Sequence, residues 1–303
     1  MRSSPRAHPT SRDEPEGSGP ERFRDVDSYR AQREWLRYEG TGQRDLFREL
    51  RERFLLRHAA EEGWVLDLGS GPGRFLPFLG RAGTRRVALD ISREMLNLLP
   101  QAWLASGSPD PAPHRVLGDA LHSPFERHRW AEVVVLGNTL GFAGNGADRL
   151  LDEAEELVAP GGVLVIEIAP APGERSRYLA RLPPSSVTRL LRSPVRAVLG
   201  RLDREGFRTE PPRHATPESF RRFTVREVQD RLRYTGWEVT ETVAVAPALG
   251  ADPLTVEAVR ADLKAWPHLL NLEEEVGRRP ERWVEAAAVL LSARRPSSKR
   301  MVK

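Results

Sequence analysis

The sequence predicts an α/β fold in which a mostly parallel sheet of seven strands is flanked by helices. The first observation is a rhythm, because short apolar runs alternate with stretches of helical periodicity, as in βαβ units. The second is a glycine-rich turn that comes directly after the first of these runs. The third is length, because 303 residues, 39% of them hydrophobic, can bury the core of one large domain.

The N-terminal part of the chain divides into a polar tail and a helical region. Residues 1–22 are rich in Pro, Ser, Gly, Arg and Glu and lack hydrophobic periodicity, so we expect them to be disordered. Over Tyr29 to His58, apolar residues recur at spacings of three, four and seven, which predicts helix, and Gly40 and Gly42 should divide it in two. Residues 23–303 are expected to form one domain.

Seven apolar runs are expected to form the strands. Five alternate with helical stretches over a core of about 60–170, and two lie in a C-terminal region of about 236–295. Near-continuous apolar runs of this kind are typical of parallel strands that are buried on both faces. The runs are WVLDLG, RRVALD, HRVLGDA, AEVVVLG, GVLVIEI, WEVTETVAVA and VEAAAVLLSA.

A long insertion separates the fifth and sixth runs. About 65 residues lie between Ala169 and Gly236, more than a crossover helix requires. We expect residues of about 170–225 to form a helical cap over a substrate site, and we expect another helix at TVEAVRADLKAW, between the last two runs. The segment FTVREVQDRLRYTGW carries an apolar helix stripe that must pack on the body of the domain, at Phe223, Val225, Val228 and Leu232.

Composition excludes several kinds of chemistry. The chain has no cysteine, which removes disulfides, zinc–thiolate sites, iron–sulfur clusters and thiol nucleophiles. No cluster of His, Asp and Glu has metal-ligand spacing, so we expect no metal site. No apolar run approaches the roughly 20 residues that a membrane helix needs, and the N-terminus lacks the apolar segment of a signal peptide. We therefore expect a cytoplasmic protein without a membrane partner.

The glycine-rich turn lies in VLDLGSGPGRF, where Asp67 is followed by Gly69, Gly71 and Gly73. Such a turn lets a ligand approach the backbone, and the start of the helix expected after it favours an anionic group. The spacing is GxGxG, whereas a dinucleotide fingerprint needs GxGxxG. Taken alone, the pattern also fits a tight turn that binds nothing.

Two carboxylates end the second and third runs, at the same edge of the predicted sheet. Asp90 lies about 20 residues beyond the glycines, where a carboxylate can accept hydrogen bonds from both ribose hydroxyls. Asp119, in Gly118-Asp119-Ala120, can accept one from an adenine amino group. The pair predicts a site for an adenosine-containing ligand, although Asp90 alone does not distinguish it from a nicotinamide site.

Four segments together resemble the class I, Rossmann-like methyltransferases that depend on S-adenosylmethionine. VLDLGSGPGRF, ALDISREML, GDALHSPF and ELVAPGGVLVIE occur in the order and spacing of that family, over roughly Trp64 to Ala169. Glu132 departs from the usual Asp but keeps the acidic character. The resemblance implies S-adenosylmethionine as the cofactor, and it implies that the cofactor is bound by Asp67, Gly69, Gly71, Gly73, Asp90, Asp119, Ala120 and Asn138.

The segment after the fourth run is expected to lie where the methyl group is transferred. GNTLGF, residues 137–142, resembles the Gly-Asn-Ser segment of glycine N-methyltransferase-like enzymes. It is not the Asn-Pro-Pro-Tyr motif with which amino-methylating nucleic-acid enzymes grip a flipped base. Asn138 either contacts cofactor or substrate or only forms the turn. No catalytic residue is identified, and the candidates are Asn138, Glu167, His122 and His214.

Arginines gather in the insertion between Arg175 and Arg213, where few acidic residues oppose them. This segment is either a solvated helical surface or a binding face for phosphate, carboxylate or RNA backbone. A small-molecule acceptor is favoured by GNTLGF and by the expected cap, whereas an RNA or protein acceptor is favoured only by the basic segment. A third hypothesis is a cofactor-binding protein without catalysis. The sequence identifies neither the acceptor nor the oligomeric state.

Overall fold

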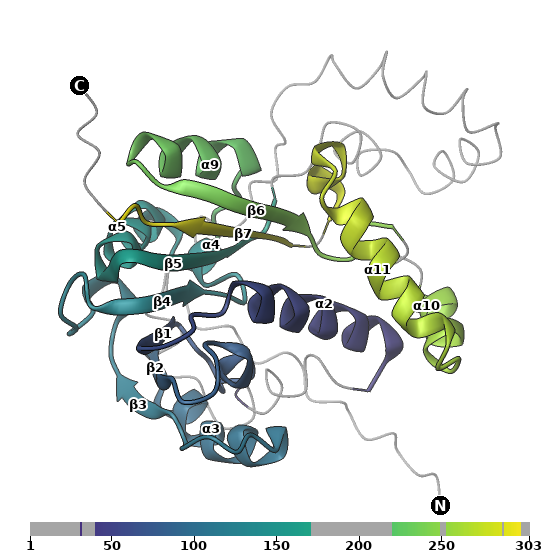
Figure 1. Ribbon diagram of the computed structural model, residues 1–303, viewed down its shortest axis with the longest axis horizontal. Helices are drawn as coiled ribbons and strands as arrows, with labels where there is room; N and C mark the ends of the chain where they lie inside the picture. The colour runs from purple at the N-terminus through teal and green to yellow at the C-terminus, as the bar shows by residue number, and fades with distance from the viewer. Residues whose placement is uncertain (1–30, 32–39, 171–219, 249–252, 287, 298–303) are drawn as a thin grey trace, which may run out of the picture.

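A computed structural model of the chain shows a sheet with helices on both faces (Figure 1). The expected tail, the first of the two N-terminal helices and the arginine-rich segment lie outside the residues that it describes. The described residues are 31, 40–170, 220–248, 253–286 and 288–297.

Seven strands form one sheet in the order β3-β2-β1-β4-β5-β7-β6. Strand β7 runs antiparallel to β5 and β6, and the other six share one direction, which confirms the predicted mostly parallel sheet. The winding reverses between β1 and β4. The strands are β1 (Trp64–Leu68), β2 (Arg85–Asp90), β3 (His114–Leu117), β4 (Trp130–Val135), β5 (Val158–Ile168), β6 (Glu238–Ala244) and β7 (Val289–Arg294).

Side chains of alternate residues in the central strands lie in two apolar layers, one on each face of the sheet. Leu66 and Leu68 of β1 point into a layer shared with helices α5 and α9, and Val65 points into a layer shared with α2, α3 and α11. The strands are therefore buried on both sides. The helices are α2 (Gly42–His58), α3 (Arg93–Ser106), α4 (Thr139–Phe142), α5 (Ala147–Leu157), α9 (Val225–Tyr234), α10 (Pro253–Arg260) and α11 (Ala265–Gly277).

The helix expected after the glycine turn does not form, and this prediction was wrong. Between β1 and β2 the chain makes only a short 3-10 helix, Leu76–Phe78. Pro77 lies within it, and proline in a helix interior lacks the N–H donor and clashes with the preceding turn. Gly80 then adopts a left-handed backbone with φ of 64°, which ends the helical path. Helix α2, which precedes β1 in the chain, covers this face through Leu46, Leu50, Phe54 and Leu55.

Helix α2 is held from outside by α10 and α11, which run beside it in Figure 1. The Gly42 N–H, in the first turn of α2, donates to Glu257 of α10 at 2.5 Å. The Trp266 indole of α11 donates to the Glu49 carboxylate at 3.0 Å. The expected helix at TVEAVRADLKAW is thus confirmed over part of its length as α10, while α11 continues beyond it.

The apolar stripe predicted on the segment before β6 packs as expected. Helix α9 begins at Val225, and its N-cap Thr224 accepts a hydrogen bond from the Glu227 N–H. The stripe lies in the same apolar layer as α5 and the sheet. Its four residues, Phe223, Val225, Val228 and Leu232, are at most 6% exposed. In the part of the chain that the structure describes, no helix combines the length and apolar character needed to cross a membrane.

Candidate active site

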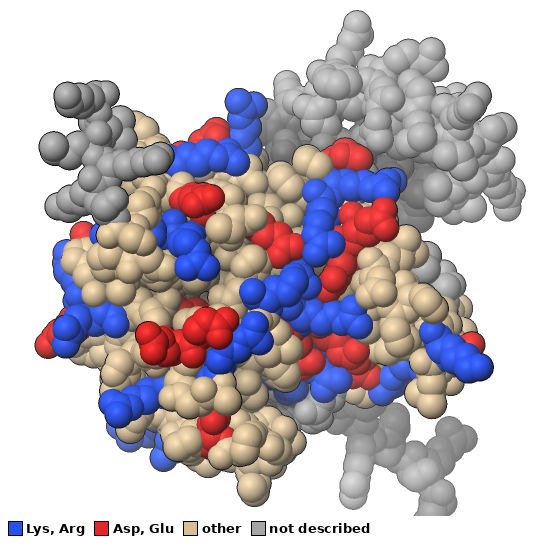
Figure 2. Space-filling view, viewed as in Figure 1, with Lys and Arg blue, Asp and Glu red and all other residues tan. Residues whose placement is uncertain are grey.

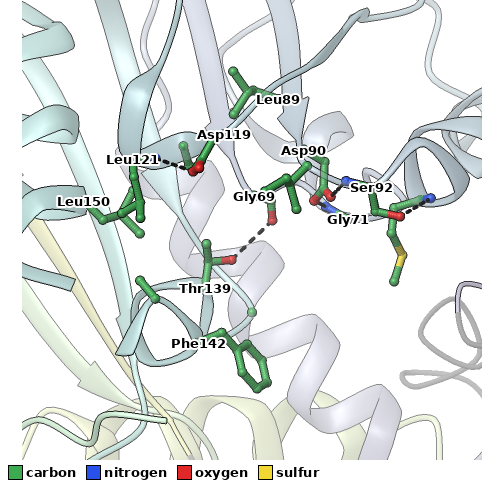
Figure 3. A pocket seen from close by; sticks show the side chains of 15 residues that line it. Gly69, Gly71, Leu89, Asp90, Ser92, Asp119, Leu121, Thr139, Phe142 and Leu150 are labelled. Carbon is green, nitrogen blue, oxygen red and sulfur yellow. Dashed lines mark hydrogen bonds between the residues drawn. The ribbon is translucent and has the colours of Figure 1, made fainter. Parts of the chain in front are cut away.

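A cavity of about 170 Å³ opens where β1, β2, β3 and β4 reach their carboxyl ends (Figure 3). Ligands of open parallel sheets bind at this edge, where the winding reverses. Five of the predicted binding residues line the cavity: Gly69, Gly71, Asp90, Asp119 and Ala120. Its apolar wall includes Leu89, Met95, Leu121, Phe142 and Leu150.

The glycine turn uses its three glycines in different ways. Gly69 and Gly71 have φ of 75° and 54°, which disfavours other residues. A Cβ on Gly69 would lie 2.4 Å from Thr139 Cγ2, whereas a Cβ on Gly71 would meet nothing within 4 Å. Gly73 instead packs against Leu76 and Leu99. Gly71 thus keeps the backbone open toward the cavity, while Gly69 and Gly73 allow close packing behind it.

Asp90 ends β2 and is tied to the glycine turn through backbone hydrogen bonds (Figure 3). Its Oδ2 accepts from the Gly71 N–H at 2.7 Å, and its Oδ1 accepts from the Ser92 N–H at 2.8 Å. Burial raises the pKa of Asp90 above its ordinary value, and these N–H donors act against that shift. Each carboxylate oxygen can accept more than one hydrogen bond, so Asp90 retains capacity for ligand donors.

Asp119 follows β3 and caps the 3-10 helix Ala120–His122. Its Oδ1 accepts from the Leu121 N–H at 2.9 Å, which fixes the carboxylate beside the wall formed by Leu121 and Leu150 (Figure 3). The His122 side chain is 60% exposed, and its Nδ1 lies 3.8 Å from Asp119 Oδ2. His122 therefore lies at the outer side of Asp119, in solvent.

Asp67 lies at the carboxyl end of β1, beside a second cavity of about 80 Å³ on the far side of the glycine turn. It is only 3% exposed, and its Oδ1 has no hydrogen-bond partner among the described residues. Burial, with smaller effects from the charges of Asp90 and Glu132, raises the pKa of Asp67 to about 8. A buried acceptor without a donor is costly, so Asp67 marks a place for a donor that comes from a ligand.

Asn138 begins the short helix α4 with a left-handed backbone, φ 65°, which asparagine tolerates. Its Oδ1 is a second buried acceptor without a partner in the described part of the chain. The neighbours Gly137 and Thr139 line the main cavity. The Thr139 hydroxyl lies 2.6 Å from Leu136 O and 3.3 Å from Gly69 O, so it joins the end of β4 to the glycine turn.

Glu167, a candidate base, is held in an ion pair that the sequence did not predict. Both carboxylate oxygens accept from the Arg51 guanidinium of α2, at 2.9 and 3.0 Å. Glu167 is fully buried and Arg51 is 5% exposed. The Gly137 N–H also lies 3.4 Å from Glu167 Oε2. The pair therefore fixes the loop that carries Asn138 to both β5 and α2.

Two phenylalanine rings pack together beside the cavity, and one of them, Phe142 of α4, lines it. Phe142 lines the cavity, and its ring meets the Phe220 ring edge to face, with centroids 5.0 Å apart. Phe220 lies close against Gly141, where a Cβ would be 2.8 Å from the ring. The Arg221 N–H donates to Gly141 O at 2.9 Å, so the chain that returns from the insertion is fixed along α4. No local sequence pattern indicates this contact, because it joins distant segments.

Metal ligands do not gather at this edge. Within the described ranges, no group of three or more His, Asp or Glu side chains is placed to hold an ion. His214, another candidate base, lies outside the described residues.

Comparison with protein families identifies the domain that holds this site. Residues 66–166 match the family described as a methyltransferase domain. These residues, about a third of the chain, form a methyltransferase domain. The matched segment begins within β1, continues through most of β5 and contains all residues that line the two cavities, and the cofactor of this methyltransferase is S-adenosylmethionine.

Solved structures share the fold of this methyltransferase. The chain is 17% identical to a chain in the complex between the Haloferax volcanii Trm112 methyltransferase activator and a methyltransferase, covering 89% of this chain and 96% of that chain, with a TM-score of 0.51. It is 14% identical to magnesium protoporphyrin IX methyltransferase from Synechocystis PCC 6803 with bound SAH. The match covers 90% of this chain and 97% of that chain, with a TM-score of 0.51. Among curated proteins, no relative matches the chain.

The residues present fit S-adenosylmethionine. Asp67 Oδ1 and Asn138 Oδ1 are buried acceptors that lack donors in the described chain, and the cofactor carries ammonium, hydroxyl and amino donors. A Cβ on Gly71 or on Gly137 would meet no atom within 4 Å, so the backbone at both positions is open to a ligand. The apolar wall between Asp90 and Asp119 suits a flat ring such as adenine.

Proposed function

We propose that this methyltransferase transfers the methyl group to a small molecule bound beside α4. The observation that carries the proposal is the Phe142 ring, which lines the cavity beside α4 and is supported from behind by the Phe220 ring. A concave apolar site with few polar groups is typical of small-molecule binding. The Phe142 ring would contact the apolar part of the acceptor and exclude water from the reacting atoms.

The cofactor would be held along the carboxyl edge of the sheet. Asp90 would accept hydrogen bonds from the ribose hydroxyls, and Asp119 would accept one from the adenine amino group. The unpartnered oxygens of Asp67 and Asn138 would receive donors from the amino-acid end. When bound, S-adenosylmethionine supplies an electrophilic methyl group on a sulfonium.

The residues of this chain would accelerate transfer mainly by positioning. Glu167 is engaged by Arg51, and His122 is directed into solvent, so neither is placed to take a proton from an acceptor in the cavity. Alignment of a nucleophile with the methyl group is itself a large contribution to rate. We therefore assign Glu167 and Arg51 to positioning of the Gly137–Asn138 loop, and we expect an acceptor that is nucleophilic at neutral pH.

An RNA or protein acceptor is the second candidate, and the arginine-rich segment from Arg175 to Arg213 is the observation that favours it. The face shown in Figure 2 does not add to that case, because basic and acidic side chains are interleaved over α2 and α11. Arg57, for example, pairs with Glu241 and Glu274. Of the two solved neighbours, one acts on magnesium protoporphyrin IX and the other binds an activator subunit, and either arrangement is compatible with this fold.

Transfer of label from methyl-labelled S-adenosylmethionine tests the proposal. The purified protein is incubated separately with metabolite, RNA and protein pools, and Asp90→Ala serves as the control with weakened cofactor binding. We expect label in the metabolite pool, and with Phe142→Ala we expect a loss of label that persists when the cofactor is saturating. Label in RNA or protein alone would contradict the small-molecule proposal.

A further inference from the structure

A second hollow, of about 520 Å³, lies at the opposite edge of the sheet, where the strands begin. It is bordered by the first residue of β1, Trp64, the first residue of β3, His114, and the first residue of β4, Trp130. Phe125 and His128, from the connection between β3 and β4, also line it and bring the number of rings to five. We call the site bordered by Trp64, His114, Phe125 and Trp130 the aromatic hollow. It shares no lining residue with the cofactor cavity.

Among the described residues, no long helix covers this part of the sheet, which leaves the hollow open. The connection between β3 and β4, residues 118–129, is described throughout and contains only the 3-10 helix Ala120–His122. Val87 and Val116 therefore face the hollow from β2 and β3. Trp64 is 37% exposed, although tryptophan contributes most to stability when it is buried.

The rings of the aromatic hollow are arranged around Trp64 and Trp130. The two indoles meet edge to face, with centroids 6.2 Å apart, and Phe125 meets Trp130 edge to face at 4.9 Å. The His114 ring lies 5.8 Å from Trp64. Despite these contacts Trp64 remains 37% exposed, and a flat ring is the shape that an exposed part of an aromatic face accepts.

Trp130, which lines the hollow, has a buried indole N–H without a hydrogen-bond acceptor in the described chain. The residue is 7% exposed, and its indole N–H has no acceptor among the described residues. Three other buried or half-buried indoles do have acceptors: Trp103 donates to Asp110 O, Trp266 to Glu49 and Trp283 to Gly277 O. A buried donor left without a partner indicates a missing acceptor. A ligand with an acidic oxygen would supply it after a small displacement of the neighbouring rings.

The charges at the rim favour an anion. The Arg85 guanidinium lies 5.2 Å from the centre of the Trp64 ring, and no ion pair joins it to a carboxylate in the described part of the chain. Arg85 and Val87 are two positions apart on β2, so their side chains lie on the same face of the sheet, the face that bears the hollow. The acidic residue of the rim, Glu126, is already paired with Arg129 at 3.1 Å.

We propose that the aromatic hollow binds a planar aromatic carboxylate. Its ring would pack against Trp64 and His114, and its carboxylate would lie between the Arg85 guanidinium and the Trp130 indole N–H. The hollow lies outside the methyl-transfer site, so the proposal does not depend on the acceptor. It assigns the protein a second small-molecule site, on the edge of the sheet remote from the cofactor.

Indole N–H resonances of the full-length protein provide the test, because the chain has seven tryptophans and Trp64→Phe and Trp130→Phe assign two of the signals. The probe is 2-naphthoate, with 2-naphthamide as its neutral counterpart, and each is titrated with S-adenosylhomocysteine at saturation. We expect naphthoate to shift the Trp64 and Trp130 signals and to bind about tenfold more tightly than the amide, because a charge-assisted contact is lost in the amide.

Two variants locate the binding. Trp64→Ala should weaken naphthoate binding about tenfold, because it removes the aromatic face against which the ligand stacks. Arg85→Gln should lower the affinity for naphthoate to that for the amide. Arg226→Gln, on exposed α9, is the matched control and should change neither. Unchanged S-adenosylhomocysteine affinity would show that the Trp64 and Arg85 variants are folded.

Three outcomes would overturn the proposal. In the first, neither indole signal shifts. In the second, naphthoate binds only when S-adenosylhomocysteine is left out, so that binding belongs to the cofactor cavity. In the third, sedimentation shows a dimer that Trp64→Ala dissociates, so that a second copy of the chain occupies the hollow.

Discussion

Different kinds of residue line the two edges of the parallel sheet. At the carboxyl edge, glycine backbones and buried carboxylates surround the cofactor cavity, and several acceptors depend on one specific donor each. At the amino edge, aromatic rings and the Glu126–Arg129 ion pair border an apolar hollow, and the Arg85 guanidinium lies over Trp64 beside it. Buried charges are costly unless they are paired, whereas apolar rings are not. Single substitutions should therefore have larger effects at the carboxyl edge than at the amino edge.

The largest effect is expected from Arg51→Ala. The substitution leaves Glu167 buried without its guanidinium partner, and breaking such a pair costs about 3–5 kcal/mol of unfolding free energy. Urea unfolding measures the loss. Arg53→Ala, on the same helix with only an exposed bond to Asn271, is the matched control and should cost less than about 1 kcal/mol. The double variant Arg51→Met/Glu167→Gln should recover part of the loss, and equal stability of Arg51→Ala and Arg53→Ala would contradict this role.

The next effect concerns the pH dependence of stability. The folded-state pKa of Asp67 is raised from 3.8 to about 8, so the folded protein binds this proton more tightly than the unfolded chain. The resulting stabilisation is fully present below the unfolded pKa and is lost as the pH rises toward 8, by about 1.4 kcal/mol per pH unit.

Asp67→Asn should remove this slope between pH 5 and 8. Because burial also raises the pKa of Glu132 to about 7, the quantity to compare is the difference between wild type and variant in urea unfolding. Parallel stability curves for the two proteins would show that Asp67 is ionised in the folded protein.

Asp90→Ala should weaken the binding of S-adenosylhomocysteine by roughly 1.5–3 kcal/mol, because it removes charged acceptors for the ribose and releases the Gly71 N–H. Isothermal titration calorimetry measures the affinity. The control is Asp148→Ala, an exposed carboxylate that pairs with Arg221. Full affinity in a folded Asp90→Ala protein would place the ribose elsewhere.

The smallest effect is expected at the amino edge. Trp64→Ala should reduce unfolding free energy by about 1 kcal/mol, because the ring is already 37% exposed, and should leave cofactor affinity unchanged. Thermal unfolding with and without S-adenosylhomocysteine measures both quantities. A loss as large as that of Arg51→Ala would remove the proposed difference between the edges.

The sequence predicted the features that depend on local pattern. All seven apolar runs form strands, and Ser92, in the segment ALDISREML, caps α3. The Asp90 and Asp119 side chains meet at one cavity because parallel strands end at one edge. The prediction of a helix after the glycine turn failed because glycine spacing carries no information on the conformation of the residues beyond the turn, which Pro77 and Gly80 decide locally.

Contacts between distant segments could not be predicted in the same way. Arg51 occupies a position within a helix of otherwise ordinary pattern, and nothing near it in the chain indicates that Glu167 is its partner. The pairing of Phe142 with Phe220 likewise depends on how the chain returns from the insertion. Such contacts are set by tertiary packing, which overrides local preference. The roles of individual residues toward the cofactor stay predictions until binding is measured.

The contacts of α10 and α11 with α2 can form only late in synthesis, because the three helices are far apart in the chain. Gly42 and its partner Glu257 are 215 positions apart, and Trp266 and Glu49 are 217 apart. At translation rates of about 5–20 residues per second, roughly 10–40 s separate the appearance of α2 from that of its partners. Until then α2 lacks these two hydrogen bonds, and α2 carries the Arg51 that pairs with Glu167. Competence to hold the cofactor should therefore appear on the ribosome only after α10 and α11 have been made.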